Sequence, residues 1–175
     1  MKKTVVTFGL ISGGISAGML LATVPLADKI GFDRGELLGY TVIVLSALLI
    51  FFGVRSYREN ASGGRLTFGR GFAVGILITL LSSVFYVATW EIVYFKFMPD
   101  FAEKYAAHEI ERAKSSGASQ DQIQKKLQEA KQFKQMYDKP AVNIALTFTE
   151  VFPIGLVVTL LSAVILRKKS PQLAA

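Results

Sequence analysis

Four long apolar stretches constrain the fold of this chain of 175 residues more than any other feature. A helix needs about 20 mostly apolar residues to cross a hydrocarbon core of roughly 30 Å. Because the stretches are continuous, they do not fit the alternating strands of a membrane β-barrel. The sequence therefore predicts an all-α integral membrane protein, a four-helix bundle formed as a single domain. The predicted spans cover residues 4–27, 37–54, 71–97 and 141–166.

Basic residues are distributed unevenly between the loops, and this asymmetry predicts an orientation. Lys and Arg are retained in the short loops on the cytoplasmic side of a membrane. The loop between the first two spans has a net charge of −1, and the long loop after the third holds eight basic and seven acidic residues. The other side carries nine basic residues, namely Lys2, Lys3, Arg55, Arg58, Arg65, Arg70, Arg167, Lys168 and Lys169, against the single acid Glu59. We therefore expect both termini to face the cytoplasm.

The formal net charge of +7 belongs almost entirely to this basic rim. Nucleic-acid-binding proteins are also basic, but this chain has no basic face interleaved with aromatic residues beyond what a membrane surface explains. We therefore expect membrane lipids, and no nucleic acid, as partners. The residues predicted to contact lipid headgroups are Arg55, Arg58, Arg65, Arg70, Arg167, Lys168 and Lys169.

The N-terminus also resembles a secretory signal, because two lysines precede an apolar run. The apolar region of such a signal is about 7 to 15 residues long, and the run here is longer. A cut after Ala27 would also place Pro25 at a position that requires a small residue. We therefore expect an uncleaved first span.

Residues 99–138 differ in composition from the spans and are predicted to form an extramembrane helical hairpin. Pro99 suits the first turn of a helix, and Gly117 suits its left-handed end. Ser119 and Gln122 have the spacing of a capping box, which starts the second arm. Each arm carries an apolar stripe, so the arms can pack on each other, lie on the membrane surface or bind a partner.

Glu150 is the one charged residue expected at depth within a predicted span. A carboxylate inside hydrocarbon is costly, so it usually faces the bundle and has a partner. Asn143, Thr147 and Glu150 stand at i, i+4 and i+7, which places them on one helix face. Such a face can bind a cation or move a proton, or it can join helices by hydrogen bonds. Pro153, three residues further on, removes a backbone N–H and can kink the helix.

Glu91 is expected at the outer interface, near the end of the third span. Tyr86, Trp90 and Tyr94 surround it and have the composition of an interfacial aromatic belt. Because Glu91 and Glu150 lie at similar depth, we also consider that they approach each other and share a proton.

Pairs of glycines four residues apart let helices approach closely. The residues predicted to pack helices in this way are Gly9, Gly13, Gly14, Gly18, Gly71 and Gly75. The sequence leaves open whether each pair packs within one chain or between two copies.

The chain lacks the residues that common kinds of catalysis, metal binding and nucleotide binding require. The chain has no cysteine and a single histidine, His108, which is expected to be solvated on the hairpin. The glycine-rich basic segment around Arg65 lacks the Gly-Lys-Ser/Thr ending of a nucleotide-binding loop. We therefore expect no catalytic residue, no metal, no cofactor and no enzymatic activity.

Two regions carry motifs of small, apolar and basic residues. The central region has GVRSYR at 53–58 and GGRLTFGRGF at 63–72. The last region has EVFPIG at 150–155, LLSA at 160–163 and RKK at 167–169. Both regions resemble those of a known family of short bacterial membrane proteins, the family of domain of unknown function 4199. The resemblance implies four spans in a bacterial inner membrane, and it carries no activity over to any residue.

Two function classes fit these observations. The first is a non-enzymatic scaffold or accessory subunit that engages lipids and either a membrane-protein partner or a second copy of the chain. The second is a small transporter or ion-conducting unit that uses Glu150 with Asn143 and Thr147, and also Glu91. A water-accessible cavity lined by Asn143, Thr147 and Glu150 would favour the second class, and side chains bonded across a dry seam would favour the first.

Overall fold

The computed structural model describes residues 1–168 of the chain, and within that part helix is the main structure. Four helical segments in this part are long and apolar enough to cross a membrane: Lys2–Ile30, Phe32–Ala61, Phe68–Phe97 and Pro140–Ile165. The predicted all-α fold with four spans is therefore confirmed, and the protein is a multi-pass membrane protein.

The first span is a long helix followed by a distorted end. Helix α1 covers Lys2–Thr23, a 3₁₀ turn η1 covers Val24–Leu26, and the short α2 covers Ala27–Ile30. Pro25 lies in the 3₁₀ turn and has no backbone N–H, which explains why the regular helix ends before the predicted boundary. Gly31 then adopts a φ of 73° and separates α2 from α3.

Helix α3 covers Phe32–Ala61 and is longer at both ends than the predicted span. The prediction counted only the uncharged residues, but a helix continues through charged residues once it leaves the hydrocarbon region. Helix α4 covers Phe68–Ile92, and Thr67 caps its start by accepting a hydrogen bond from the backbone N–H of Arg70.

Two further features complete the spans. A π-helical turn, η2 at Val93–Phe97, follows α4 and leads out of the bundle. Helix α7 covers Pro140–Ile165 and continues as one helix past Pro153.

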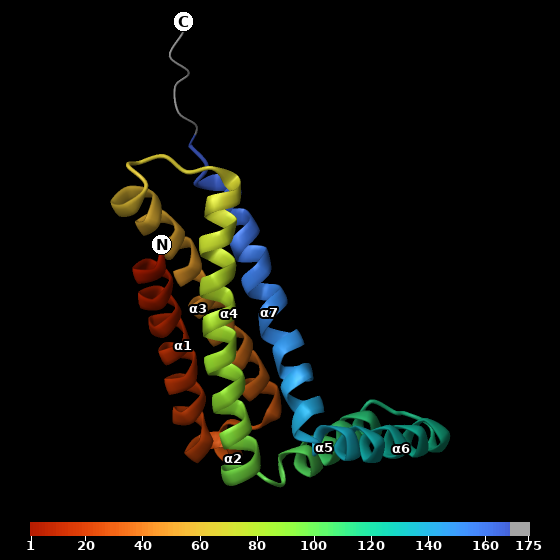
Figure 1. Ribbon diagram of the computed structural model, residues 1–175. Helices are drawn as coiled ribbons and strands as arrows, with labels where there is room; N and C mark the ends of the chain where they lie inside the picture. Colours follow the sequence, from red (N-terminus) through yellow and green to blue (C-terminus); the bar gives the residue numbers. More distant parts are fainter. Residues whose placement is uncertain (169–175) are drawn as a thin grey trace, which may run out of the picture.

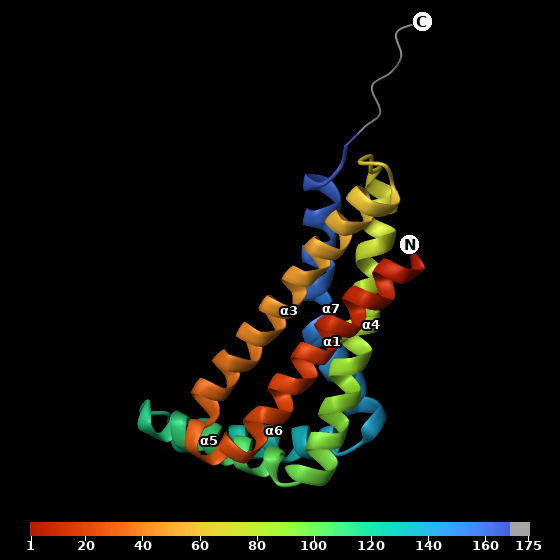
Figure 2. The same ribbon diagram turned by 90° about the vertical axis from the view of Figure 1, so that its left-hand side faces the viewer.

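The four spans form a bundle in which α4 packs against both α1 and α7 (Figure 1). Figure 2 shows that α3 leans away from the other three helices as it approaches its N-terminal end. Helices α5 (Phe101–Ser115) and α6 (Gln120–Tyr137) lie across this same end of the bundle, with the chain running out along α5 and back along α6. We call these two helices the α5–α6 pair, and their end of the bundle the α5–α6 end.

The turn inside the α5–α6 pair follows the sequence pattern. Gly117 has a φ of 81°, as expected for a left-handed helix end. The backbone N–H of Ala118 donates to the carbonyl of Ala113, which satisfies a carbonyl of the last turn. Ser119 and Gln122 form the predicted capping box. Helix α5 begins at Phe101, so Pro99 lies just before it and not in its first turn.

Close helix packing concentrates on α4. An added Cβ at Gly75 would lie 2.8 Å from Cγ2 of Thr159, and one at Gly155 would lie 2.5 Å from Cγ2 of Thr79. The α4–α7 seam therefore requires glycine on both helices, and Gly155 was not among the predicted packing residues.

The other predicted glycines divide into two groups. Added Cβ atoms at Gly9 and Gly13 would meet Leu81 and Phe85 of α4, and one at Gly71 would meet Leu66 and Ala163. At Gly14 and Gly18 an added Cβ would meet nothing within 4 Å. These two glycines therefore do not pack helices within one chain, because they lie on the face of α1 that points away from the bundle.

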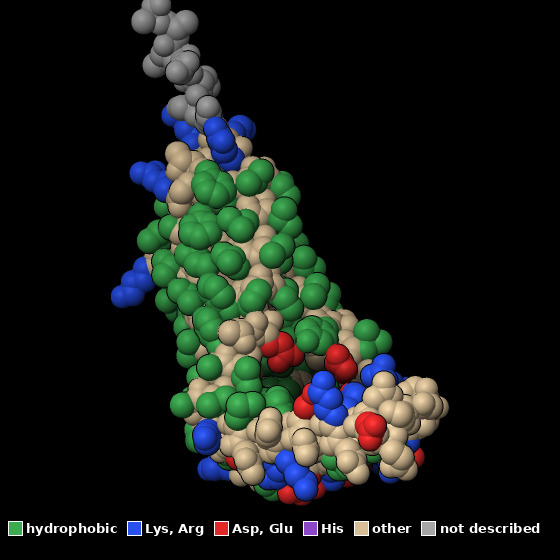
Figure 3. All heavy atoms as spheres, turned by 90° about the vertical axis from the view of Figure 1, so that its right-hand side faces the viewer, with side chains coloured by type: hydrophobic (Ala, Val, Ile, Leu, Met, Phe, Trp, Pro, Cys, Tyr) green, Lys and Arg blue, Asp and Glu red, His purple; other side chains and the backbone are tan. Residues whose placement is uncertain are grey.

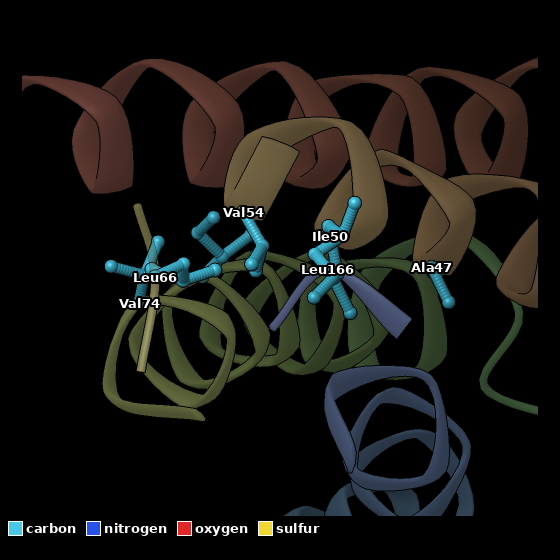
Figure 4. Close-up of a cluster of buried hydrophobic side chains, with 7 residues drawn as sticks. Ala47, Ile50, Val54, Leu66, Val74 and Leu166 are labelled. Atoms are coloured by element: carbon cyan, nitrogen blue, oxygen red, sulfur yellow. The ribbon is translucent and has the colours of Figure 1, made fainter. Parts of the chain in front are cut away.

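The aliphatic core lies at the opposite end, near the α3–α4 loop and the C-terminus (Figure 4). It contains Ala47, Ile50, Val54, Leu66, Val74, Ile78 and Leu166. Residue 66 comes from the loop, and its backbone pairs with Lys168 in an isolated antiparallel bridge. We call this the basic end, because Lys and Arg side chains surround it. Figure 3 shows a broad apolar surface between this end and the mixed charges of the α5–α6 pair.

Candidate functional site

Polar side chains from several elements meet where the α5–α6 pair joins the bundle. Asn143 is fully buried in the first turns of α7, and its Nδ2 donates to the carbonyl of Tyr137 at 3.2 Å. Thr147 is also buried, and its hydroxyl donates to Oδ1 of Asn143 at 3.2 Å. Asn143 therefore ties α7 to the end of α6, and Thr147 bonds to Asn143 within α7.

Glu150 lies on the same face of α7 but in a different environment. Its side chain is exposed, whereas Asn143 and Thr147 are covered. Tyr40 of α3 is a polar neighbour of the carboxylate. Asn143 lies close to the end of α6, where its Nδ2 bonds to the carbonyl of Tyr137, and Glu150 lies two turns further along α7. The three residues therefore differ in their surroundings, although they share one helix face.

Glu91 occupies the end of α4 and has one carboxylate oxygen, Oε1, buried with no hydrogen-bond partner in residues 1–168. No hydrogen bond joins it to Glu150 in the described chain. The hypothesis that the two acids share a proton therefore gains no support from their contacts.

The predicted aromatic belt is wrong for two of its three residues. Tyr86 and Tyr94 are 8% and 1% exposed, so protein and not lipid surrounds them. The hydroxyl of Tyr94 donates to Oδ1 of Asp138 at 2.6 Å, and Nε1 of Trp90 donates to the hydroxyl of Tyr137 at 2.8 Å. The aromatic residues at the end of the third span hold the end of α6 in place. We call Trp90, Tyr94, Phe101, Tyr137 and Asp138 the junction.

Ring contacts reinforce these hydrogen bonds. Phe101 meets Trp90 edge to face with ring centroids 5.1 Å apart, and Tyr94 meets Tyr137 in the same way at 5.1 Å. Such pairs contribute about 0.5 to 1.5 kcal/mol each beyond their buried area. The junction is therefore rigid in two ways, through directional bonds and through ring packing.

Ionised groups extend the junction toward the surface. Nζ of Lys134 lies 2.8 Å from Oδ2 of Asp138 and 3.5 Å from Glu103, so it links α6 to α5. The bonds from Lys134 and Tyr94 hold the pKa of Asp138 below its ordinary value. The same carboxylate raises the pKa of Lys134, and burial raises the pKa of the Tyr137 phenol.

The α5–α6 pair also contacts the turn between the first two spans. Lys104 lies 3.3 Å from Asp28, and Nε2 of His108 lies 3.2 Å from Oδ1 of Asp33. The His108 ring also packs on Phe32 with centroids 5.3 Å apart. The side chain of His108 is 29% exposed, so it is only partly solvated, because long-range contacts that the local sequence does not encode cover part of its ring.

The basic end presents most of its predicted residues to the surroundings. Arg55, Arg65, Arg70, Arg167 and Lys168 are exposed, and Lys169 lies outside the described residues. Arg58 is the exception, because its guanidinium contacts Glu59 at 3.1 Å and the carbonyl of Leu166 at 3.5 Å. It therefore joins α3 to the end of α7.

No group of three or more His, Cys, Asp or Glu side chains is arranged to hold a metal ion in the part of the chain described here. The contacts at the α5–α6 end instead connect structural elements: α4, α5, α6 and α7 through the junction, and the turn at Asp28 and Asp33 through ion pairs. The arrangement fixes the position of the α5–α6 pair relative to the spans.

Comparison with known proteins agrees with the four-span architecture. A family model described as "Protein of unknown function (DUF4199)" matches residues 7–168. No curated protein and no solved structure matches the chain. Because the match covers all four spans and the α5–α6 pair, the chain belongs to this family of proteins of unknown function, DUF4199.

Proposed function

We propose that this protein is a non-enzymatic scaffold or accessory subunit of a bacterial inner membrane, with both termini in the cytoplasm. One observation carries the proposal. The buried polar side chains of α7 bond to neighbouring protein groups, and the junction fixes the α5–α6 pair to the end of the bundle. A rigid extramembrane element on a membrane anchor suits the binding of a partner protein.

The surface of α6 is the part of the pair best placed to meet a partner. Leu127 and Met136 are 40% and 49% exposed, and none of the residues of α6 is buried. Lys125 and Glu129 lie on the same helix, so the surface combines apolar and charged groups. Partner surfaces commonly have this mixed character.

Photo-crosslinking in cells tests the proposal. A photoreactive residue at Leu127 should yield a discrete product with another membrane protein, and the reciprocal crosslink from that protein should recover this chain. Leu45, which is 57% exposed on α3, supplies the matched control, because its lipid-facing position should yield no protein product. Crosslinks from Leu127 to lipid alone, in cells that contain the native partners, would contradict the scaffold function.

The basic end supports a second element of the same function, the binding of anionic lipid headgroups. Arg65 and Arg70 are exposed beside the apolar surface, where an anionic headgroup attracts each charge by about 1 kcal/mol. Native mass spectrometry should show fewer bound phosphatidylglycerol molecules after Arg65→Gln and Arg70→Gln. Lys125→Gln on α6 is the control and should leave the count unchanged.

A further inference from the structure

A small polar cavity lies inside the bundle, between the aliphatic core and the junction. Its volume is about 20 Å³, and all four spans contribute to its lining. The polar lining residues are Ser12, Ser16, Ser46, Thr79, Ser83 and Tyr86, with Ser82 at its edge.

Ser46 places an unpartnered hydroxyl at the wall of this cavity. Its side chain is 5% exposed, and its Oγ is buried with no hydrogen-bond partner in residues 1–168. An unpaired buried hydroxyl is costly, and a serine in a membrane helix can usually avoid it by bonding to the carbonyl four residues earlier. Here the hydroxyl lies at the cavity wall instead.

The neighbouring hydroxyls have free acceptor capacity. Ser12 donates to the carbonyl of Ser46 at 2.9 Å, and Ser16 donates to the carbonyl of Ser12 at 3.0 Å. Each hydroxyl oxygen can accept further hydrogen bonds after its proton is committed. A molecule that both donates and accepts hydrogen bonds can therefore bond to Ser46 and to these serines together.

Size and charge identify the class of ligand. A cavity of about 10 to 15 Å³ already holds one water, so 20 Å³ accommodates one molecule and excludes larger organic ligands. The lining contains no carboxylate, and an ion without a counter-charge is disfavoured in such a site. We propose that the cavity is a binding site for one water molecule, which is hydrogen-bonded to Ser46 and links α1, α3 and α4.

Water-to-protein magnetisation transfer in the protein in lipid bicelles tests this site directly. Cross-peaks from water to protons of Ser46 and Ser83 are expected in the unmodified protein, and Ser46→Val should abolish the peak at Ser83. Exposed residues of α6 supply the positive control, because their cross-peaks should persist in both proteins. If the control cross-peaks of α6 are present and the unmodified protein shows no cross-peak at Ser46 or Ser83, the proposal is overturned.

Thermal unfolding supplies a second, independent readout. Valine at position 46 fills the cavity, so it should lower the unfolding midpoint by about 2 to 6 °C by displacing the bound water. Thr41→Val on the exposed face of the same helix is the matched control and should change the midpoint by less than about 1 °C. An increased midpoint for Ser46→Val would show a dry site and overturn the proposal. A midpoint that rises when sodium replaces choline in the buffer would also overturn it, because the occupant would then be a cation.

Discussion

The two ends of the bundle are stabilised by different interactions. At the basic end, aliphatic side chains such as Ile50, Val54 and Val74 form a continuous apolar cluster. At the α5–α6 end, the contacts are hydrogen bonds, ring pairs and ion pairs, as in the bond from Tyr94 to Asp138 at 2.6 Å. Aliphatic packing tolerates changes that conserve volume, whereas a hydrogen bond depends on particular atoms in a particular direction.

The difference indicates which end is specialised. Lipid tails are as apolar as Leu, so an aliphatic core holds helices together only through close packing. The junction adds directional contacts that determine where the α5–α6 pair lies. The part of the molecule with the most specific geometry is therefore the part that presents a helical pair beyond the spans.

The α4–α7 seam joins both ends, and its disruption should have the largest effect. Gly155→Leu places a side chain where even a Cβ lies 2.5 Å from Thr79, so it should destabilise the bundle by about 3 kcal/mol. Gly18→Leu is the control, because nothing lies within 4 Å of its added Cβ. Denaturant unfolding in detergent micelles compares the two variants, and equal stabilities would contradict the packing of this seam.

Removal of one junction hydroxyl should loosen the α5–α6 end alone. Tyr94→Phe removes the bond to Asp138, with an expected cost of about 1 to 2 kcal/mol. Amide hydrogen exchange should become faster in α6 and remain unchanged in α3 near the basic end. Tyr57→Phe, which changes a tyrosine beside the aliphatic core, is the matched control. Unchanged exchange in α6 would show that the junction does not fix the pair.

A conservative change at the basic end should lower the stability of the bundle by less and leave the α5–α6 end unaffected. Ile50→Val removes one methylene from the aliphatic core and should cost about 1 kcal/mol. Amide hydrogen exchange in α6 should keep the rate of the unmodified protein, since Ile50 belongs to the aliphatic core and not to the junction. Faster exchange in α6 for this variant would indicate that the two ends unfold as one unit, and the comparison would then fail.

The smallest effect concerns pH. Because the pKa of Asp138 is lowered in the folded protein, its stabilisation is present above the ordinary carboxyl pKa of about 3.9 and is lost as the pH falls through the lowered value. The raised pKa of Lys134 has the opposite consequence, so its contribution is present below about pH 10 and is lost at higher pH. Fluorescence of Trp90, the only tryptophan, should be constant between about pH 5 and 9 and change below about pH 4.

A variant of Asp138 tests whether this residue causes the change in Trp90 fluorescence at low pH. Asp138→Asn should remove the change in fluorescence on the acid side, and it should also weaken any change above about pH 10, because Asp138 is the main partner of Lys134. An acid transition of the same size in Asp138→Asn would assign it to another carboxylate.

The sequence predicts those features that depend on local patterns. The four spans, the left-handed Gly117 and the capping box of Ser119 follow from apolar length, backbone freedom and side-chain spacing, and all three are present. The i, i+4 spacing also places Asn143 and Thr147 on one face of α7. These features need no knowledge of which helices are neighbours.

The features that the sequence does not predict depend on tertiary contacts. The burial of Tyr94 depends on its contacts with Tyr137 and Asp138, and Tyr86 lies beside α7. The bond from Trp90 to Tyr137 joins residues 47 positions apart, which no local spacing reveals. One sequence signal could have suggested the junction: Trp90 and Tyr137, two aromatic residues with polar groups, stand on either side of the charged loop between the third and fourth spans.

The most direct test of the account is the accessibility of single cysteines in intact cells, since the natural chain contains none. Lys125→Cys on α6, which is 77% exposed, should react with a membrane-impermeant maleimide. Arg65→Cys at the basic end should react only after the cells are permeabilised, and Leu45→Cys should remain unreactive within the lipid. Labelling of Lys125→Cys and Arg65→Cys from the same side, or labelling of Leu45→Cys, would contradict four membrane spans with the α5–α6 pair outside.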